Sequence, residues 1–515
     1  MGLWSFYFIV KVILYYMDYI SFHFFANAAF ATCLIFSHYN SRLFFLRRLL
    51  AIPIGIMLLY FDSPFPPIRN VIPKLSQLAD FSFQYYLELI TRVVGWQAIL
   101  ALLALLLIYY LLSKWLRMDT IAALAIVCTL LPLKANVDSN IFDGDGKTIG
   151  VASDAELSEA LDVFFITEES RLGYDRKQKV NAPPFDVIVI SVCSLAWDDL
   201  EYVKEIDNPF FRRFQALFTS FNSASSYSGP SIIRLLRASR GQQDQRDLYK
   251  PPLDDALLFN NLKSNGYQTQ LAMNHDGKYG DLLNEIRTIG GMSSPLFDNK
   301  KASPSLKGFD GSQVYDDYSV LSQWWDARMK MPNERVALFY NTITLHDGNR
   351  SLDGRLENSV DTYSRRLHKL LGDMDRFYEK VNTSGRNVVI VFVPEHGAAI
   401  RRNKNEIVGM REVPGPNVTN IPVGILLTSK TEGEVKTSII KQPSSYLAAS
   451  ELISRFISKP PFVGNSGKNN LDEYLKDLPT TRFVSENEDL VIMRFGASYY
   501  FRSNDINWNL YQTAN

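Results

Sequence analysis

This sequence has few cysteines and no excess of basic residues, and each of these features excludes a class of protein. The chain has 515 residues but only three cysteines and six histidines, and its 54 lysines and arginines balance 54 aspartates and glutamates. A chain without a basic excess is not expected to bind nucleic acid generally, so we expect no nucleic-acid partner. Cys33 and Cys128 lie in apolar stretches, which leaves Cys193 alone in the polar part. That part therefore cannot form an internal disulfide, and its fold must rest on a hydrophobic core.

Apolar residues, by contrast, are abundant near the start of the chain. Because a membrane-spanning helix needs roughly 20 mostly apolar residues, residues 1–134 are expected to form a transmembrane α-helical bundle of about five helices. The candidate segments are residues 6–19, 24–36, 43–60, 96–112 and 120–133. The first two are short and Lys11 interrupts the first, so the number of spans stays open between about four and six.

The basic residues between these segments predict the orientation of the bundle. Arg42, Arg47 and Arg48 lie between the second and third segments, and Lys114 and Arg117 lie between the fourth and fifth. Short loops rich in Lys and Arg stay in the cytoplasm, so with five spans everything after about residue 134 lies outside. Residues 63–94 mix prolines with apolar and aromatic residues, which predicts an interfacial amphipathic segment on the outer side.

The pattern changes twice beyond the apolar part. Residues 135–184 predict a linker, within which Ser153 and Glu156 form the capping box of a helix. From residue 185 to residue 515, apolar runs of strand length alternate with amphipathic helical segments. The runs begin at Val187, Thr269, Val336, Val388 and Val423. Apolar runs without alternation are typical of strands buried on both faces, so this domain is expected to be an α/β sandwich with a mostly parallel sheet.

Residues that can bind a metal gather directly after these runs, where the ligand site of such a sheet lies. The first run ends at Cys193 and the fourth at Glu395 and His396, while His346 and His275 follow the third and the second. An adjacent acid and imidazole are costly to bury without a charge partner, and thiolate, imidazole and carboxylate together suit zinc. For His275 alone, a hydrogen-bonded structural role is the more frequent outcome.

A serine-rich stretch, FNSASSYSGPSIIRLLRASRGQ, begins at Phe221 and leads into an expected helix. Pro230 suits the first turn of that helix. A serine at this place meets free backbone N–H groups that favour an anion such as phosphate, and a zinc site with an open position activates an oxygen. Ser228 is therefore either a plain N-cap or a nucleophile, and on this stretch alone the N-cap is the more frequent outcome.

Taken together, these motifs resemble the alkaline-phosphatase superfamily in its lipid-dependent phosphoethanolamine transferase branch. Within that branch the serine-rich stretch, with TLHDGNR, VPEHG, KQPSSYLA and ISVCSLAWDDL, is similar to the cellulose phosphoethanolamine transferases of bacterial cellulose-secretion systems. The resemblance covers nearly the whole chain, including the apolar part. It implies an alkaline-phosphatase-like α/β domain in the periplasm, anchored by the transmembrane bundle.

The resemblance also implies which residues form the site. The zinc ligands would be Cys193, Ser228, Glu395 and His396. Ser228 would also be the nucleophile, with Tyr227, His346 and Arg411 as further catalytic residues. Arg411 is the best match to an arginine that lies downstream of the acid–histidine pair in such enzymes.

The implied reaction is a two-step transfer by a multi-pass protein of the bacterial inner membrane. Ser228 would take phosphoethanolamine from phosphatidylethanolamine and pass it to the glucose C6 hydroxyl of nascent cellulose. Subunits of the cellulose synthase complex would be further partners. A sulfatase is not expected, because neither CSLAW nor SGPSI has the x-Pro-x-Arg pattern after its Cys or Ser.

Three alternatives stay open. One is a phosphoglycerol transferase, because the ligands of a metal do not identify the head group of the donor. Another is a phosphoethanolamine transferase that acts on lipid A or another envelope glycan. The last is a non-catalytic assembly subunit of the synthase complex, which would tolerate the loss of Ser228.

Overall fold

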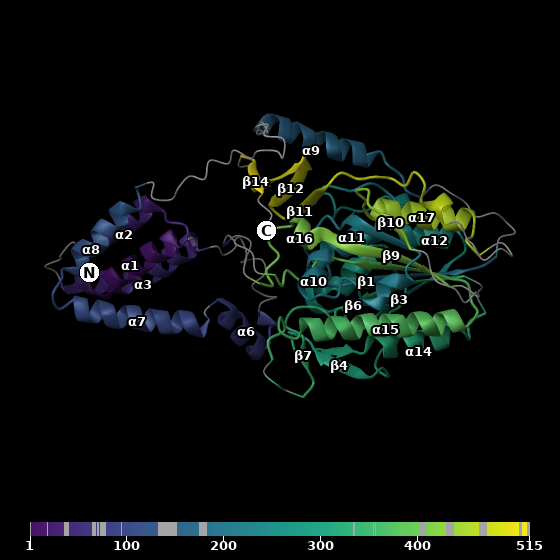
Figure 1. Ribbon diagram of the computed structural model, residues 1–515, viewed down its shortest axis with the longest axis horizontal. Helices are drawn as coiled ribbons and strands as arrows, with labels where there is room; N and C mark the ends of the chain where they lie inside the picture. The colour runs from purple at the N-terminus through teal and green to yellow at the C-terminus, as the bar shows by residue number, and fades with distance from the viewer. Residues whose placement is uncertain are drawn as a thin grey trace. The chain divides into compact units, whose positions relative to one another are not determined.

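The chain forms two compact units, one of residues Met1–Ala79 and Leu89–Val151 and one of Asp80–Glu88 and Ala152–Asn515 (Figure 1). The computed structural model describes residues 2–17, 19–35, 41–63, 68, 72, 79–93, 95–131, 152–174, 183–332, 335–353, 355, 357–401, 408–428, 437–462, 471–503 and 507–511. Structural statements below concern these residues.

Helices form at all five apolar segments that the sequence singles out. They are α1 (Leu3–Tyr16), α2 (Phe24–Ile35), α3 (Ser41–Asp62), α7 (Trp96–Leu112) and α8 (Met118–Cys128). Lys11, which interrupts the first segment, is buried, and its Nζ lies 2.6 Å from Asp62 Oδ2 and 2.7 Å from Asn27 Oδ1. The charge inside this apolar unit is therefore paired, as buried charges must be.

No helix in the described part of the chain is long and apolar enough to cross a bilayer alone. The helical stretches Phe83–Arg92 and Trp96–Leu112 meet the length and composition of a span only as a pair, and the pair is bent by 60°. Of the amphipathic segment predicted at 63–94, the structure describes helix α6 (Phe83–Val93), while most of residues 64–78 lie outside the described part.

All five predicted apolar runs are strands of one seven-stranded sheet, in the order β10-β2-β9-β8-β1-β6-β3. The strands are β1 (Asp186–Val192), β2 (Ala216–Asn222), β3 (Gln268–Met273), β6 (Val336–Thr342), β8 (Val388–Pro394), β9 (Asn420–Leu427) and β10 (Ser438–Ile440). Strands β8, β1, β6 and β3 pair in parallel, and so do β10 and β2.

The fifth run departs from the predicted parallel arrangement, which makes the sheet mixed. Strand β9 pairs antiparallel with both β2 and β8. No crossover helix returns the chain between the end of β8 and the start of β9, since the described part of this connection holds only the short α16 (Pro416–Thr419). The chain therefore re-enters the sheet from the edge where β8 ends and must run in the opposite direction.

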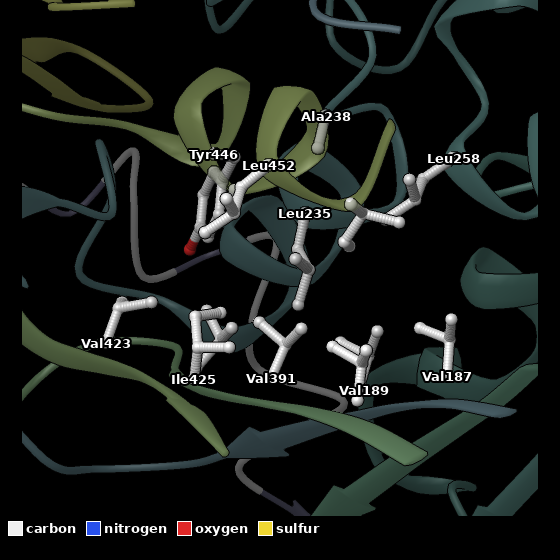
Figure 2. Close-up of a cluster of buried hydrophobic side chains, with 14 of the residues drawn as sticks. Val187, Val189, Leu235, Ala238, Leu258, Val391, Val423, Ile425, Tyr446 and Leu452 are labelled. Carbon is white, nitrogen blue, oxygen red and sulfur yellow. The ribbon is translucent and has the colours of Figure 1, made fainter. Parts of the chain in front are cut away.

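Helices cover both faces of this sheet (Figure 1). One face carries α11 (Ser228–Leu236), α12 (Leu258–Ser264), α13 (Leu282–Thr288) and α17 (Tyr446–Ser458), and the other α14 (Asp317–Arg328) and α15 (Tyr363–Thr383). Val187 and Val189 of β1 point to the first group, and Ile188 and Ile190 point to the second. Figure 2 shows the first core, with strand valines beneath Leu235. This double burial explains the continuous apolar runs of the sequence.

A second, antiparallel sheet near the end of the chain has no counterpart in the sequence prediction. It contains β11 (Val484–Asn487), β12 (Leu490–Phe495), β13 (Ser498–Ser503) and β14 (Asn509–Tyr511). Helix α9 (Asp154–Glu169) packs on it, with Leu157, Leu161 and Phe164 in a shared core. The predicted capping box of α9 is present, because Ser153 and Glu156 each bond the backbone N–H of the other.

Shorter elements complete the larger unit. They are helices α10 (Trp197–Tyr202) and α18 (Asp472–Leu475) and a small sheet of β4 (Pro304–Lys307), β5 (Gln313–Tyr315) and β7 (Arg350–Ser351).

Candidate active site

Four predicted ligand residues meet at the carboxyl edge of the large sheet. Cys193 Sγ lies 3.4 Å from Ser228 Oγ and 3.9 Å from His396 Nε2. Ser228 Oγ lies 3.1 Å from the same His396 Nε2. The ligand atoms of Cys193, Glu395 and His396 all lie within 4.8 Å of one another, and the three side chains are buried. The structure thus brings together residues that are far apart in the sequence.

The parallel pairing of β1 and β8 produces this meeting. Val192 pairs with Pro394, so the residues that follow the two strands emerge side by side. Beyond the strands the two segments stay joined, because Leu195 N donates to His396 O at 2.6 Å. Ser194 adopts a left-handed backbone with φ of 65°, which is uncommon for a residue other than glycine and turns the chain away directly after Cys193.

Of the two Glu395 carboxylate oxygens, only Oε1 accepts hydrogen bonds in the described part of the chain. Ser191 Oγ and Asn341 Nδ2 donate to Oε1 at 3.0 and 2.5 Å, whereas Oε2 is buried without a hydrogen-bond partner. Neither Ser191 nor Asn341 was predicted from the sequence to belong to the site. Each is a polar residue inside an otherwise apolar buried strand, and this pattern is a usable signal because such residues need a buried partner.

His275 has a structural role in holding this carboxylate. Its Nδ1 accepts from Gly277 N at 3.1 Å, so its Nε2 carries the proton and donates to Asn341 Oδ1 at 2.8 Å. Asn341 is thereby oriented with its amide N–H groups toward Glu395. This outcome agrees with the more frequent interpretation of His275, a hydrogen-bonded structural residue.

The His396 imidazole has the tautomer that a metal ligand needs. Its Nδ1 lies 2.8 Å from Gly397 O, and since a carbonyl oxygen can only accept, Nδ1 carries the proton. Nε2 therefore presents a lone pair to Cys193 and Ser228. Metal-binding histidines commonly fix their second nitrogen on a carbonyl or carboxylate in this way.

Burial disfavours charge on each of the three ligand side chains. It raises the pKa of the Cys193 thiol to about 12 and that of the Glu395 carboxyl to about 7, and it lowers the pKa of His396 well below its usual range. A divalent cation would compensate a thiolate and a carboxylate here and would supply the missing partner of Glu395 Oε2. Sulfur, nitrogen and oxygen donors in this combination fit zinc.

Ser228 is the first residue of helix α11 rather than its cap. Tyr227 occupies the N-cap position in an extended conformation, and no side chain caps the helix. The interpretation of Ser228 as a plain N-cap is therefore wrong, because its hydroxyl turns to Cys193 and His396 instead of to the backbone. The N–H groups of the first turn keep their capacity to bind an anion.

Two other predicted catalytic residues line this site. Arg411 Nη1 donates to Ser194 Oγ at 3.0 Å, while its buried Nε has no hydrogen-bond partner among the described residues. Tyr227 Oη donates to Glu412 Oε1 at 2.6 Å, a contact between residues 185 positions apart in the sequence. Arg411 is close enough that its charge lowers the pKa of both His346 and His396, after the larger effect of burial.

The third, His346, contacts Asp347 and Phe309 through its side chain. No hydrogen bond joins it to Ser228 or to the ligand side chains within the described part of the chain. Its Nδ1 lies 2.7 Å from Asp347 O, and its ring stacks on Phe309 with the centroids 4.6 Å apart. Burial and the Arg411 charge lower its pKa to about 4, so the imidazole is neutral near pH 7.

Known proteins and family models match the sequence of this chain over nearly its full length. The family models described as Cellulose biosynthesis protein BcsG N-terminal domain and C-terminal domain match residues 4–131 and 144–508. The protein called Cellulose biosynthesis protein BcsG of Salmonella typhimurium is 36% identical over 537 residues, covering 98% of this chain and 95% of that protein. The protein of the same name from Escherichia coli is 35% identical over 538 residues, with the same coverage.

Solved structures overlap the chain more weakly. A protein in the alkaline phosphatase superfamily from Vibrio parahaemolyticus has a TM-score of 0.48 and 11% identity, covering 69% of this chain and 87% of its own. The C-terminal periplasmic domain of EcEptC from Escherichia coli, in complex with Zn, has a TM-score of 0.45 and 13% identity, covering 61% and 92%. The family assignment rests on the sequence matches alone.

Proposed function

Because the chain belongs to the BcsG family of cellulose biosynthesis proteins, we propose that it transfers phosphoethanolamine from phosphatidylethanolamine to the C6 hydroxyl of glucose units in nascent cellulose. The observation that carries this proposal is the Ser228 hydroxyl, which lies 3.1 Å from His396 Nε2 and 3.4 Å from Cys193 Sγ at the start of a helix. A hydroxyl in that position suits attack on a phosphoryl group, because the helix N-terminus attracts its charge.

Zinc would be held by Cys193, Glu395, His396 and Ser228. The support is the set of three buried donors, the Glu395 Oε2 atom without a hydrogen bond and the lone pair on His396 Nε2. When bound, zinc would supply positive charge that lowers the pKa of a hydroxyl and offsets the charge of phosphoryl oxygens.

In the first step, Ser228 Oγ forms a bond to phosphorus, and the bond between phosphorus and the glycerol oxygen breaks. The diacylglycerol oxygen gains one proton, which balances the proton lost by the Ser228 hydroxyl, and phosphoethanolamine remains on Ser228. Arg411 donates to the phosphoryl oxygens through the N–H group that lacks a partner in the described structure. The N–H groups in the first turn of α11 do the same.

In the second step, the glucan C6 oxygen forms a bond to phosphorus, the bond from phosphorus to Ser228 Oγ breaks, and Ser228 regains a proton. His346 is suited to accept the proton of the glucan hydroxyl. Its lowered pKa keeps the imidazole neutral, and the contact of Nδ1 with Asp347 O leaves the lone pair on Nε2. Tyr227, fixed on Glu412, would line the approach to the nucleophile.

We place residues 1–134 at the bacterial inner membrane, with the segment 63–94 at its outer surface, where Asp80–Glu88 joins the larger unit. Residues 135–184 form the periplasmic linker, whose helix α9 packs on the larger unit, and residues 185–515 form the periplasmic catalytic domain. Cellulose synthase subunits are the proposed partners. Helix α7 supports a membrane location, because its sequence WQAILALLALLLIYYLL is apolar and none of its residues is buried in the described structure. Such a helix needs lipid or another protein to cover it. A membrane location would also hold the site close to a lipid donor that does not dissolve in water.

The test is the Ser228→Ala variant in cells that make cellulose, followed by solid-state NMR of the polymer. We expect the phosphoethanolamine signal to disappear while the protein is still produced at its normal level. The matched control is Ser293→Ala, an exposed serine, which should leave the signal intact. If phosphoethanolamine persists on the glucan in the Ser228→Ala strain, the proposed nucleophile and mechanism are wrong.

A further inference from the structure

A carboxylate that the mechanism does not use lies beside the nucleophile. A Cβ atom placed on Gly229, the residue after Ser228, would lie 3.0 Å from Glu285 Oε2 and 3.7 Å from Tyr249 Oη. Glu285 belongs to helix α13, which packs against α11. Ser228, Gly229 and Glu285 are all partly accessible, so solvent can reach both the nucleophile and this carboxylate.

The Glu285 carboxylate has no cationic partner in the described part of the chain. No Lys, Arg or His lies within ion-pair distance of it there, and no donor forms a hydrogen bond with its oxygens. Partial burial and the neighbouring Asp281 raise its pKa, which is the direction expected when no cation compensates the charge. A carboxylate so close to a phosphoryl site would repel the substrate unless the substrate itself brings a positive charge.

We propose that Glu285, together with the Tyr249 hydroxyl, binds the ammonium group of the ethanolamine head group and so selects it over neutral or anionic head groups. This inference rests on the proposed function. Only two carbons separate the ethanolamine nitrogen from its phosphate ester oxygen, so a phosphorus atom in reach of Ser228 places the ammonium close to Gly229. An ammonium has three N–H donors and no acceptor. A carboxylate oxygen and a phenol oxygen can both accept hydrogen bonds from those donors.

The same geometry opposes the alternative donor. A phosphoglycerol head group carries no cation, so its binding would leave Glu285 partly desolvated and unpaired next to a phosphate. An unpaired charge of this kind rejects the wrong ligand more strongly than an apolar contact would. Glu285 therefore separates a phosphoethanolamine transferase from a phosphoglycerol transferase, a distinction that the metal ligands do not make.

The test uses purified full-length protein in detergent with two soluble donors, p-nitrophenyl phosphoethanolamine and ethyl p-nitrophenyl phosphate, which lacks the amine. For the wild type we expect a higher kcat/KM with the amine-bearing ester. In Glu285→Gln, kcat/KM for that ester should fall roughly 10- to 100-fold, as for the loss of a charged hydrogen bond. The ester without the amine should be turned over at an unchanged or higher rate.

Three further variants sharpen this test. Glu285→Asp, which keeps the charge, should retain part of the preference, and Tyr249→Phe should reduce it. The control is Glu473→Gln, an exposed glutamate paired with Lys459, which should change neither rate. Tyr249→Phe also serves if Glu285→Gln fails to fold.

The outcomes separate this inference from the function on which it rests. If Glu285→Gln slows both esters equally, or if its preference equals that of the wild type, ammonium recognition by Glu285 is wrong while the transferase proposal stands. If the wild type does not distinguish the two esters, the inference is likewise wrong. If the wild type turns over neither ester, the proposed function fails and the inference fails with it.

Discussion

Tyr85 Oη donates a 2.7 Å hydrogen bond to Oδ2 of Asp347, the residue that directly follows His346. Tyr85 belongs to the stretch Asp80–Glu88, which groups with the larger unit. Ser359 joins the same arrangement, because its Oγ lies 2.6 Å from Asp347 Oδ1 and 2.7 Å from Glu88 Oε1. A short segment from the first hundred residues therefore fixes the loop that carries a proposed catalytic histidine.

Because of this contact, we expect Tyr85→Phe to lower kcat by leaving His346 less well positioned. Losing the hydrogen bond should cost the loop about 1–2 kcal/mol of stabilisation and lower kcat several-fold. The measurement is a double-mutant cycle of kcat, with Tyr85→Phe made in the wild type and in His346→Ala. Tyr85→Phe should have little effect once His346 is absent, and an equal loss in both backgrounds would show that the two residues are not coupled.

Replacing Cys193 should abolish zinc binding at the proposed site. Cys193→Ala removes the sulfur donor from a buried set of three ligands, so the zinc content of the purified protein should fall from about one ion per chain to near zero. Mass spectrometry of the metal in purified protein measures this directly. The control is Cys33→Ala, which removes an exposed thiol in another part of the chain and should leave the zinc content unchanged. Equal zinc in both variants would remove Cys193 from the site.

Asn341 should affect metal affinity without touching the metal. Its amide donates to Glu395 Oε1 at 2.5 Å, so Asn341→Ala leaves that carboxylate less well oriented. Zinc affinity should fall roughly 10- to 100-fold, measured by competition with a chelator of known affinity, while full occupancy is still reached at high zinc. Asn260→Ala, which alters a half-buried asparagine with a solvent-exposed hydrogen bond to Asp254, is the matched control. Unchanged affinity in Asn341→Ala would contradict the orienting role.

Stability of the larger unit should depend on Asp186, at the start of β1. This buried carboxylate accepts from Arg328 Nε and Nη2 at 3.0 and 2.9 Å and from Val336 N at 2.7 Å. Asp186→Asn would leave the buried Arg328 charge without its carboxylate and should lower the free energy of unfolding by about 3–5 kcal/mol.

Thermal unfolding of the full-length chain in detergent measures this effect. Asp326→Asn is the matched control, because Asp326 is exposed and pairs with Lys380 at the surface, where such a pair contributes about 0–1 kcal/mol. A melting temperature equal to that of the control would mean that the Asp186–Arg328 pair contributes little to stability.

Much of the large sheet could be predicted from the sequence, because burial of a strand on both faces requires a continuous run of apolar residues. The runs at Val187, Thr269, Val336, Val388 and Val423 are apolar without alternation, and each is a strand. The same apolar pattern does not show whether a strand pairs parallel or antiparallel, so the antiparallel pairing of β9 was not predicted. The small sheet of β11 to β14 was also missed. Strands β11 and β14 have only four and three residues, and β11 is largely polar in sequence, while most residues of β13 are only partly buried. Their pattern is therefore hard to distinguish from that of loops.

The main residues of the candidate site could be recognised in the sequence, because Cys193, Glu395 and His396 follow apolar strands and Ser228 lies at the start of a helix. Each of these positions depends only on neighbouring residues, since a reactive side chain directly after an apolar run can be recognised in the sequence. The fold was needed to show that Ser191, Asn341 and His275 orient Glu395, that Tyr85 holds the loop of His346, and that Glu285 lies beside Gly229. Those contacts join residues tens to hundreds of positions apart, and strand order and helix packing alone set which of them meet.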